Sequence, residues 1–218
     1  ANGSTTTGNV SSANTKNVKW EGQCIWRYHP KKKTFEIYAE GGGNTFSLDF
    51  DSKGRLFVVD VGNRRIETFD PAGAHAGSIG GRGEQSGQFT APRSIALDAQ
   101  DRLYVGAGDD YLVQRFDPAG AYLDTFGNGN LDETLYRVGG LAADGSDRIF
   151  VSQVTRHMVQ AFDISGDGRP KLLWEMGGKP GAGMQSFNSP GGMSIDNGRL
   201  YVADTRNDRI VSFDIAQP

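Results

Sequence analysis

The sequence predicts an all-β fold built from repeated short sheets, because one pattern of sixteen residues occurs four times without a gap. Each copy begins with Arg, has an aromatic residue third and Val fourth, and ends in Phe-Asp. An Asp also stands three or four residues before each copy. Successive copies start 47, 46 and 51 residues apart. The four copies are 55–70, 102–117, 148–163 and 199–214.

Each repeated unit contains four short segments with strand signals. In the second unit they are 94–98, 103–105, 112–116 and 122–126. The turn Asp-Pro-Ala-Gly at 117–120 separates the last two, because Asp bonds the backbone ahead, Pro presets φ and Gly accepts a positive φ. One such sheet cannot bury both of its faces alone. Four-stranded units of roughly 45 residues therefore predict blades stacked around an axis, which is a β-propeller.

Two stretches of the chain resemble a known repeat. The sequence Gly-Gln-Phe-Thr-Ala-Pro-Arg-Ser-Ile-Ala-Leu-Asp at 87–98, followed by Arg-Leu-Tyr-Val at 102–105, is similar to the NHL repeat, and 187–210 is similar to it again. The third unit departs from the pattern, because Leu-Tyr-Arg-Val at 135–138 replaces Phe-x-x-Pro. The resemblance covers 44–214 and implies a β-propeller of NHL-like four-stranded blades.

The number of blades is less well determined than their type. Segments 25–28 and 34–38 align with third and fourth strands, but the first two strands of that blade are not evident upstream. We expect about five bladed units, either in a five-bladed ring with degenerate strands in 1–20 or as part of a six-bladed ring. We expect residues 1–19, rich in Ser, Thr, Asn and Gly, to form a flexible N-terminal segment, and 20–218 to form the propeller.

Composition narrows the choice of partners. The net charge is −3 and the isoelectric point about 5.6, so we expect no nucleic-acid partner, which would usually require a basic surface. No apolar run is long enough to span a bilayer. Cys24 is the only cysteine, so no internal disulfide forms. The start of the sequence fits the mature end of an exported protein, and we expect a periplasmic or secreted location.

Ligands of propellers usually bind where loops converge near the axis. The loops between second and third strands and the loops between blades share one side of the molecule, which we call the loop face. An arginine-rich loop face would suit carboxylate, phosphate or polysaccharide ligands; alternatively, its arginines pair with neighbouring acids and hold the loops. The ligand-binding candidates are Arg64, Arg93, Asp109, Asp110, Tyr111, Arg137, Arg156, His157, Asp204 and Arg206.

The sequence offers little catalytic chemistry. His29 and His75 fall on the opposite side from His157, so a metal site built from histidines is not expected, and the zinc chemistry of some NHL-like lyases is in doubt. Asp60 and Asp204 end second strands, where they could hold Ca²⁺ or, as we favour, start an Asx-type turn. We predict no catalytic residue, no other metal site and no cofactor apart from that calcium alternative.

Two hypotheses for function follow. The first is a non-catalytic binding or scaffold propeller that recognises a protein or glycan, or another anionic ligand, through its loop face; self-association would be open to it if the ring is incomplete. The alternative is an extracytoplasmic propeller enzyme, either lactonase- or lyase-like or similar to quinone-dependent sugar dehydrogenases, whose propeller the segment 42–57 resembles. The missing catalytic constellations favour the first hypothesis.

Overall fold

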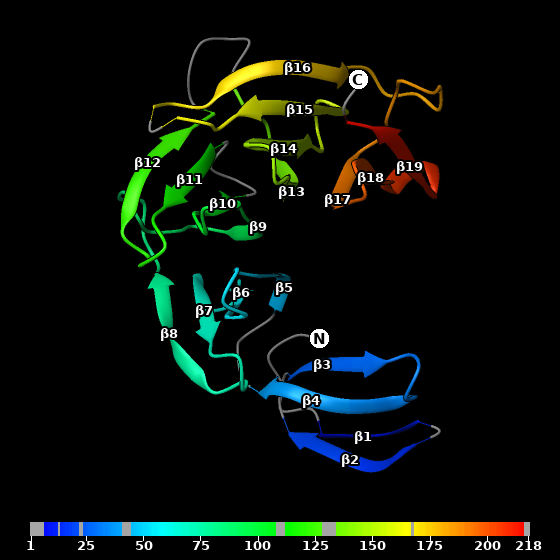
Figure 1. Cartoon of the computed structure of the whole chain (residues 1–218). Coiled ribbons are helices and arrows are strands. Elements are labelled where there is room, and N and C mark those ends of the chain that lie inside the picture. Colours follow the sequence, from blue (N-terminus) through cyan, green and yellow to red (C-terminus); the bar gives the residue numbers. More distant parts are fainter. Residues whose placement is uncertain are drawn as a thin grey trace.

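The computed structural model describes residues 7–12, 14–21, 24–40, 45–107, 112–127, 134–166 and 168–215. Apart from one short 3₁₀ helix, η1 (Thr205–Asn207), all its elements are β-strands, and the sheets form an arc around a central axis (Figure 1). The predicted all-β propeller is confirmed. In the described part of the chain, no helix is long and apolar enough to cross a membrane.

Four consecutive antiparallel sheets form the blades, and each is ordered as the chain runs. The first three blades have four strands, and the last has three described strands. The first two blades are β5 (Thr45–Phe50), β6 (Leu56–Asp60), β7 (Arg65–Phe69) and β8 (His75–Gly80), then β9 (Pro92–Leu97), β10 (Leu103–Ala107), β11 (Leu112–Phe116) and β12 (Tyr122–Phe126). The last two are β13 (Val138–Ala143), β14 (Arg148–Gln153), β15 (Met158–Asp163) and β16 (Lys171–Gly177), then β17 (Pro190–Asp196), β18 (Arg199–Asp204) and β19 (Arg209–Asp214).

The hydrophobic core lies between the blades, as the repeated aromatic residues predict. Phe57 and Ile66 of the first blade share a buried cluster with Leu103 and Phe116 of the second. The same positions of the second and third blades enter equivalent clusters with the blade that follows. Burial of these large side chains between sheets is the main source of stability in such a stack. Because the contacts link neighbours only, each blade depends on the blades at its sides.

The loops between blades are anchored by one buried apolar side chain each. Phe89, Leu135 and Phe187 occupy equivalent places and are fully buried. The amide N–H of Leu135 bonds the carbonyl of Gly127 at 2.7 Å, so this loop closes although its sequence lacks the Phe-x-x-Pro pattern. In the third unit, Leu135 therefore replaces the Phe of the pattern but occupies the same buried place.

The N-terminal part consists of two hairpins. They are β1 (Thr7–Ser12) with β2 (Thr15–Glu21), and β3 (Cys24–His29) with β4 (Thr34–Glu40). Ile25 and Tyr38 pack against the first blade, where the Tyr38 hydroxyl donates to the Pro71 carbonyl at 3.1 Å. The strands expected at 25–28 and 34–38 are present. The boundary predicted between a flexible segment 1–19 and the propeller falls inside β2, and that division stays a prediction.

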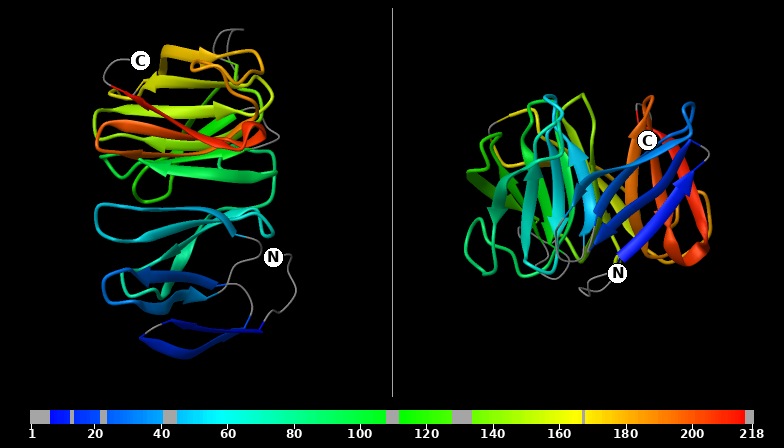
Figure 2. Two further views of the ribbon diagram at one scale, coloured as in Figure 1. Left: turned by 90° about the vertical axis from the view of Figure 1, so that its right-hand side faces the viewer. Right: turned by 90° about the horizontal axis from the view of Figure 1, so that it is seen from below.

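The hairpin β1–β2 does not supply the missing first two strands of the sheet that contains β3. Strand β2 lies beside β4 instead of β3, and the Thr15 hydroxyl accepts a hydrogen bond from the Phe35 amide at 3.0 Å. The β3–β4 hairpin therefore has β1–β2 on its outer side. Seen from the side, the sheets stand in a stack whose turns and loops gather on two opposite faces (Figure 2).

Candidate functional site

The innermost strands of the four blades line an open pocket of about 280 Å³ at the axis, which we call the axial channel. Strands β5, β9, β13 and β17 each contribute a short stretch of residues to its wall. Three of the four stretches contain a small polar side chain, and the stretch of β13 is Leu-Ala-Ala. The lining residues are 47–49, 94–96, 141–143 and 192–195.

Polar side chains of the channel join neighbouring blades. The Ser47 hydroxyl accepts a hydrogen bond from the Ile95 amide at 3.3 Å, and the Ser94 hydroxyl accepts one from the Leu141 amide at 2.8 Å. Asp49 accepts from the Leu97 amide at 2.8 Å. Burial raises the pKa of the Asp49 carboxyl, although hydrogen bonds from backbone amides oppose the shift. These groups act as links between inner strands, which have no shared backbone ladder.

The loop face contains the predicted arginines. Arg137 and Arg206 are exposed, and Arg64 and Arg93 are partly buried. Among the described residues, none of these four has a carboxylate within ion-pair distance. The Nε of Arg93 is buried and has no hydrogen-bond partner in that part of the chain. The interpretation that loop-face arginines pair with acids thus gains no support from these four.

Arg156 is held more tightly than the other loop-face arginines. Its guanidinium lies 4.7 Å from the centre of the Tyr136 ring, and Nη1 donates to the Thr134 carbonyl at 3.4 Å. A guanidinium stacked on an aromatic face keeps its charge and its remaining donors available. Arg156 can therefore add to the positive charge of the loop face from a fixed position.

The opposite face shows the contrasting arrangement. There the first Arg of a repeat copy pairs with the Asp that precedes it in the turn between first and second strands. Arg55 Nε lies 2.5 Å from Asp51 Oδ2, Arg102 Nε 2.6 Å from Asp98 Oδ2, and Arg148 Nη2 2.7 Å from Asp144 Oδ2. On this turn face, three copies of the repeat arginine are thus paired with a carboxylate. The four loop-face arginines described above have no such partner among the described residues, although another loop-face arginine, Arg209, pairs with Asp204 at 2.7 Å.

Two predicted site residues have structural roles. His157 has a positive φ of 55°, and its Nδ1 accepts a hydrogen bond from the Ser189 amide at 3.0 Å, which fixes the loop before the last blade. Asp204 is fully buried and accepts bonds from the Asn188 amide, Asn207 and Arg209 at 2.6, 2.8 and 2.7 Å. Burial alone would raise the pKa of Asp204, but these hydrogen bonds lower it overall.

Asp60 accepts a hydrogen bond from the Asn63 amide at 3.0 Å, which agrees with a carboxylate that starts the loop. Asp204 makes no such bond to the backbone of its own loop, because its partners are the Asn188 amide and the side chains of Asn207 and Arg209. Within the described ranges, no three His, Cys, Asp or Glu side chains come together as metal ligands. The candidates Asp109, Asp110 and Tyr111 lie outside the described residues.

Sequence reasoning missed two parts of the site. Asp49 lines the channel, and the signal was available: the aligned residues of the other blades are Ala96, Ala142 and Ser194. The buried Gln114 also escaped notice, although it organises the loop before its blade. Its Nε2 donates to the Gln88 carbonyl at 2.7 Å, and its Oε1 accepts from the Gly87 amide at 2.8 Å.

Comparisons with known proteins agree with this architecture. Residues 187–213 match the model of the NHL repeat. A comparison with curated proteins found no match. Among solved structures, similar chains include a hydrazine synthase of Kuenenia stuttgartiensis, with a TM-score of 0.57 and 14% identity over 79% of this chain and 46% of the other. The WD40 repeats of RRP9 give 0.54 and 14% over 78% and 51%, and U3-55K gives 0.52 and 13% over 78% and 51%.

The chain spans about half the length of these solved chains, and at such identities the likeness concerns the fold alone. The family match covers the loop anchored by Phe187 and the three strands of the last blade. The sheet arrangement and this match both indicate propeller blades. The protein is a β-propeller, and its last described blade matches the model of the NHL repeat.

Proposed function

We propose that the protein is a non-catalytic binding propeller that recognises an anionic ligand, a glycan or an acidic protein surface, through its loop face. The observation that supports this proposal is the set of loop-face arginines without carboxylate partners among the described residues: Arg64, Arg93, Arg137 and Arg206. They come from loops of different blades, so one ligand lying across the face could contact several of them.

The chemistry of these side chains suits such a ligand. A guanidinium presents a planar set of donors that matches carboxylate, sulfate and phosphate oxygens, often in pairs of parallel hydrogen bonds. The chain as a whole carries a net charge of −3, so general attraction of polyanions would be weak. Any anion binding would therefore have to come from a local patch. An exported protein that meets extracellular polysaccharides would be a natural setting, and we include a periplasmic or secreted location in the proposal.

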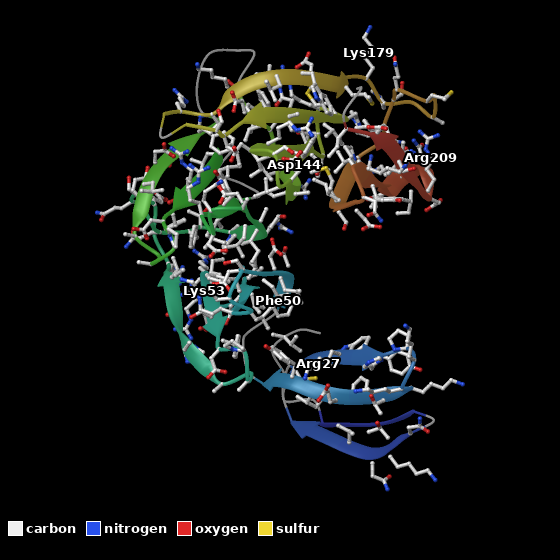
Figure 3. All side chains as sticks on the ribbon, viewed as in Figure 1. Arg27, Phe50, Lys53, Asp144, Lys179 and Arg209 are labelled. Carbon is white, nitrogen blue, oxygen red and sulfur yellow. The ribbon has the colours of Figure 1, made fainter. Side chains whose placement is uncertain are left out.

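The test compares two triple variants with equal loss of charge. One removes Arg93, Arg137 and Arg206 from the loop face, each replaced by Gln. The matched control replaces Lys53, Lys171 and Arg199 by Gln; these exposed cations lie at the turn face or its edge, away from the loops (Figure 3 labels Lys53). The probes are heparin and an unsulfated dextran of similar length, with affinity measured by titration at several salt concentrations.

We expect the unchanged protein to bind heparin and not dextran, with an affinity that falls as salt rises. The loop-face variant should lose this binding at least tenfold, and the turn-face control should keep it. Equal losses in both variants would mean that only net charge matters, and no heparin binding by the unchanged protein would remove the basis for an anionic ligand. Circular dichroism melts of the unchanged protein and the two variants verify that all three are folded.

A further inference from the structure

The blade-to-blade interface repeats with the same two positions in each blade. The third residue of a repeat copy and the apolar residue early in its third strand both face the next blade. In the first blade these are Phe57 and Ile66, with 3% and 0% of their surface exposed. In the second blade they are Tyr104 and Val113, and in the third Phe150 and Val159, all fully buried.

The last blade has the same two positions, and there they are uncovered. Tyr201 is 36% exposed and Ile210 is 67% exposed. The opposite side of this blade, with Leu200 and Val202, is buried against the third blade. Burial alternates strictly along β19, as it does for an antiparallel strand packed on one side only. Tyr201 and Ile210 are thus exposed because their blade ends the described arc, and not because their residue types differ from those of the other blades.

A hydrogen bond between neighbouring blades also repeats along the arc, beside the apolar interface. In three blades the first Arg of the copy donates to the backbone carbonyl that follows the final Asp of the next copy. Arg55 Nη2 donates to Pro118 O at 3.1 Å, Arg102 Nη2 to Ile164 O at 2.8 Å, and Arg148 Nη1 to Ile215 O at 2.6 Å. In the last blade, Arg199 Nη2 instead reaches Ser212 Oγ of its own sheet at 3.1 Å.

The axial channel is open on the same side. Its wall is formed by β5, β9, β13 and β17, and Figure 1 shows the last blade and the N-terminal hairpins at the two ends of the arc. On β5, at the other side of this opening, Leu48 and Phe50 are about half exposed. In Figure 3, Arg209 marks the last blade, and no described strand lies beyond it on the open side.

From these repeats we infer that the Tyr201–Ile210 side of the last blade is a docking surface for one further blade of the same type. Its occupant would be a four-stranded antiparallel sheet with aliphatic residues on its first two strands. It would also offer a carbonyl to Arg199 after its third strand. This assignment continues an interface that the chain already forms three times with the same positions. The same blade would extend the wall of the axial channel beyond β17.

The register of the repeat allows a direct test in one chain. Asp117 and Asp214 both end a copy, so residues 118–166 can follow Asp214 without a break in the pattern. This long chimera adds an outer strand and the first three strands of a blade, whose Leu141, Ile149 and Val151 natively share a cluster with Tyr104. A short chimera, with 118–127 alone after Asp214, adds the outer strand but no facing blade and is the control.

Ile210→Asp is introduced into the original chain and both chimeras, and thermal unfolding is followed by circular dichroism. We expect a small change in the melting temperature (Tm) of the original chain and the short chimera, since the side chain is mostly exposed there. In the long chimera we expect a loss of roughly 5 °C or more, because the charge would enter an apolar interface. Arg199→Gln should likewise lower the Tm of the long chimera alone, and Ile210→Val should be tolerated in all three.

A second measurement does not depend on Tm. With Cys24→Ser in the background, Ile210→Cys should react with a thiol reagent quickly in the original chain and at least tenfold more slowly in the long chimera. Equal reactivity, equal sensitivity to Ile210→Asp, or a long chimera that fails to fold would each overturn the inference. If light scattering shows a dimer of the original chain that Ile210→Asp dissociates, the occupant is a second copy and the inference of a blade is wrong.

Discussion

In the second blade, Nε of Arg102 donates a hydrogen bond to Oδ2 of Asp98 at 2.6 Å, inside a turn that the carboxylate also closes. Oδ1 of Asp98 accepts the amides of Gln100 and Arg102, both at 2.9 Å, and the Tyr104 hydroxyl donates to Oδ2 at 3.0 Å. One buried carboxylate thereby fixes the turn, the arginine and the aromatic residue of the repeat. Since the Arg102 guanidinium also bonds the next blade, loss of Asp98 would loosen a contact between blades.

We therefore predict that Asp98→Ala lowers the free energy of unfolding by about 3 kcal/mol, because several buried donors lose their acceptor at once. Urea unfolding measures the change. Asp196→Ala is the matched control: Asp196 holds the same position in the last blade but is exposed, with one side-chain bond from Asn197. Its effect should stay below about 0.5 kcal/mol. Similar losses in both variants would show that burial and the arginine contact add nothing.

The lowered pKa of Asp204 predicts a dependence of stability on pH. The folded state holds this carboxyl ionised more strongly than the unfolded chain does, so its contribution is complete above the unfolded pKa of about 4. It is lost as the pH falls through the lower, folded value. Asp204→Asn should therefore destabilise the protein most at neutral pH, and the difference from the unchanged protein should shrink below about pH 4. Urea unfolding at a series of pH values tests this; a constant difference would contradict it.

The geometry of His157 predicts a structural and not a catalytic role. His157→Ala should cost about 2 kcal/mol, because alanine neither accepts the Ser189 amide bond nor tolerates a positive φ as well as the original residue. His157→Asn should recover much of the loss, since Asn adopts positive φ readily and carries an acceptor. Thermal melts compare the two variants. Equal destabilisation by Ala and Asn would show that neither feature matters at this position.

The fold was predictable because its determinants repeat along the chain. Phe57, Tyr104, Phe150 and Tyr201 recur at one position, and that position faces the next blade wherever a next blade exists. The number of blades was harder to predict, because the N-terminal hairpins lack the repeat pattern. There the sequence indicated β3 and β4 correctly but could not show that β2 would lie beside β4. Such a pairing depends on contacts distant in sequence, which local patterns do not encode.

For the candidate site, the sequence predicted the face on which the loop arginines lie, but not whether each charged side chain would have a partner. The order of the strands places the loops that contain Arg93, Arg137 and Arg206 on one face. Whether a charged group is paired depends on distances between side chains, which the sequence does not give. In the structure, Arg55, Arg102 and Arg148 of the turn face have carboxylate partners, and these three loop-face arginines have none among the described residues. His157 and Asp204 looked similar to ligand-binding residues in sequence, but their hydrogen bonds serve the fold.

A final prediction concerns the loop anchors. Gly80 has a φ of +82°, and a Cβ there would lie 2.2 Å from the Phe89 ring, so Gly80→Ala must both strain the backbone and displace the anchor. Gly198 has a similar φ of +73° but open space around it. Gly198→Ala should cost only the strain, about 1 kcal/mol, whereas Gly80→Ala should cost about 3 kcal/mol or more. Urea unfolding of both variants measures the difference, which isolates the contact with Phe89. If the two losses are equal, the loop adjusts freely and Phe89 does not anchor it.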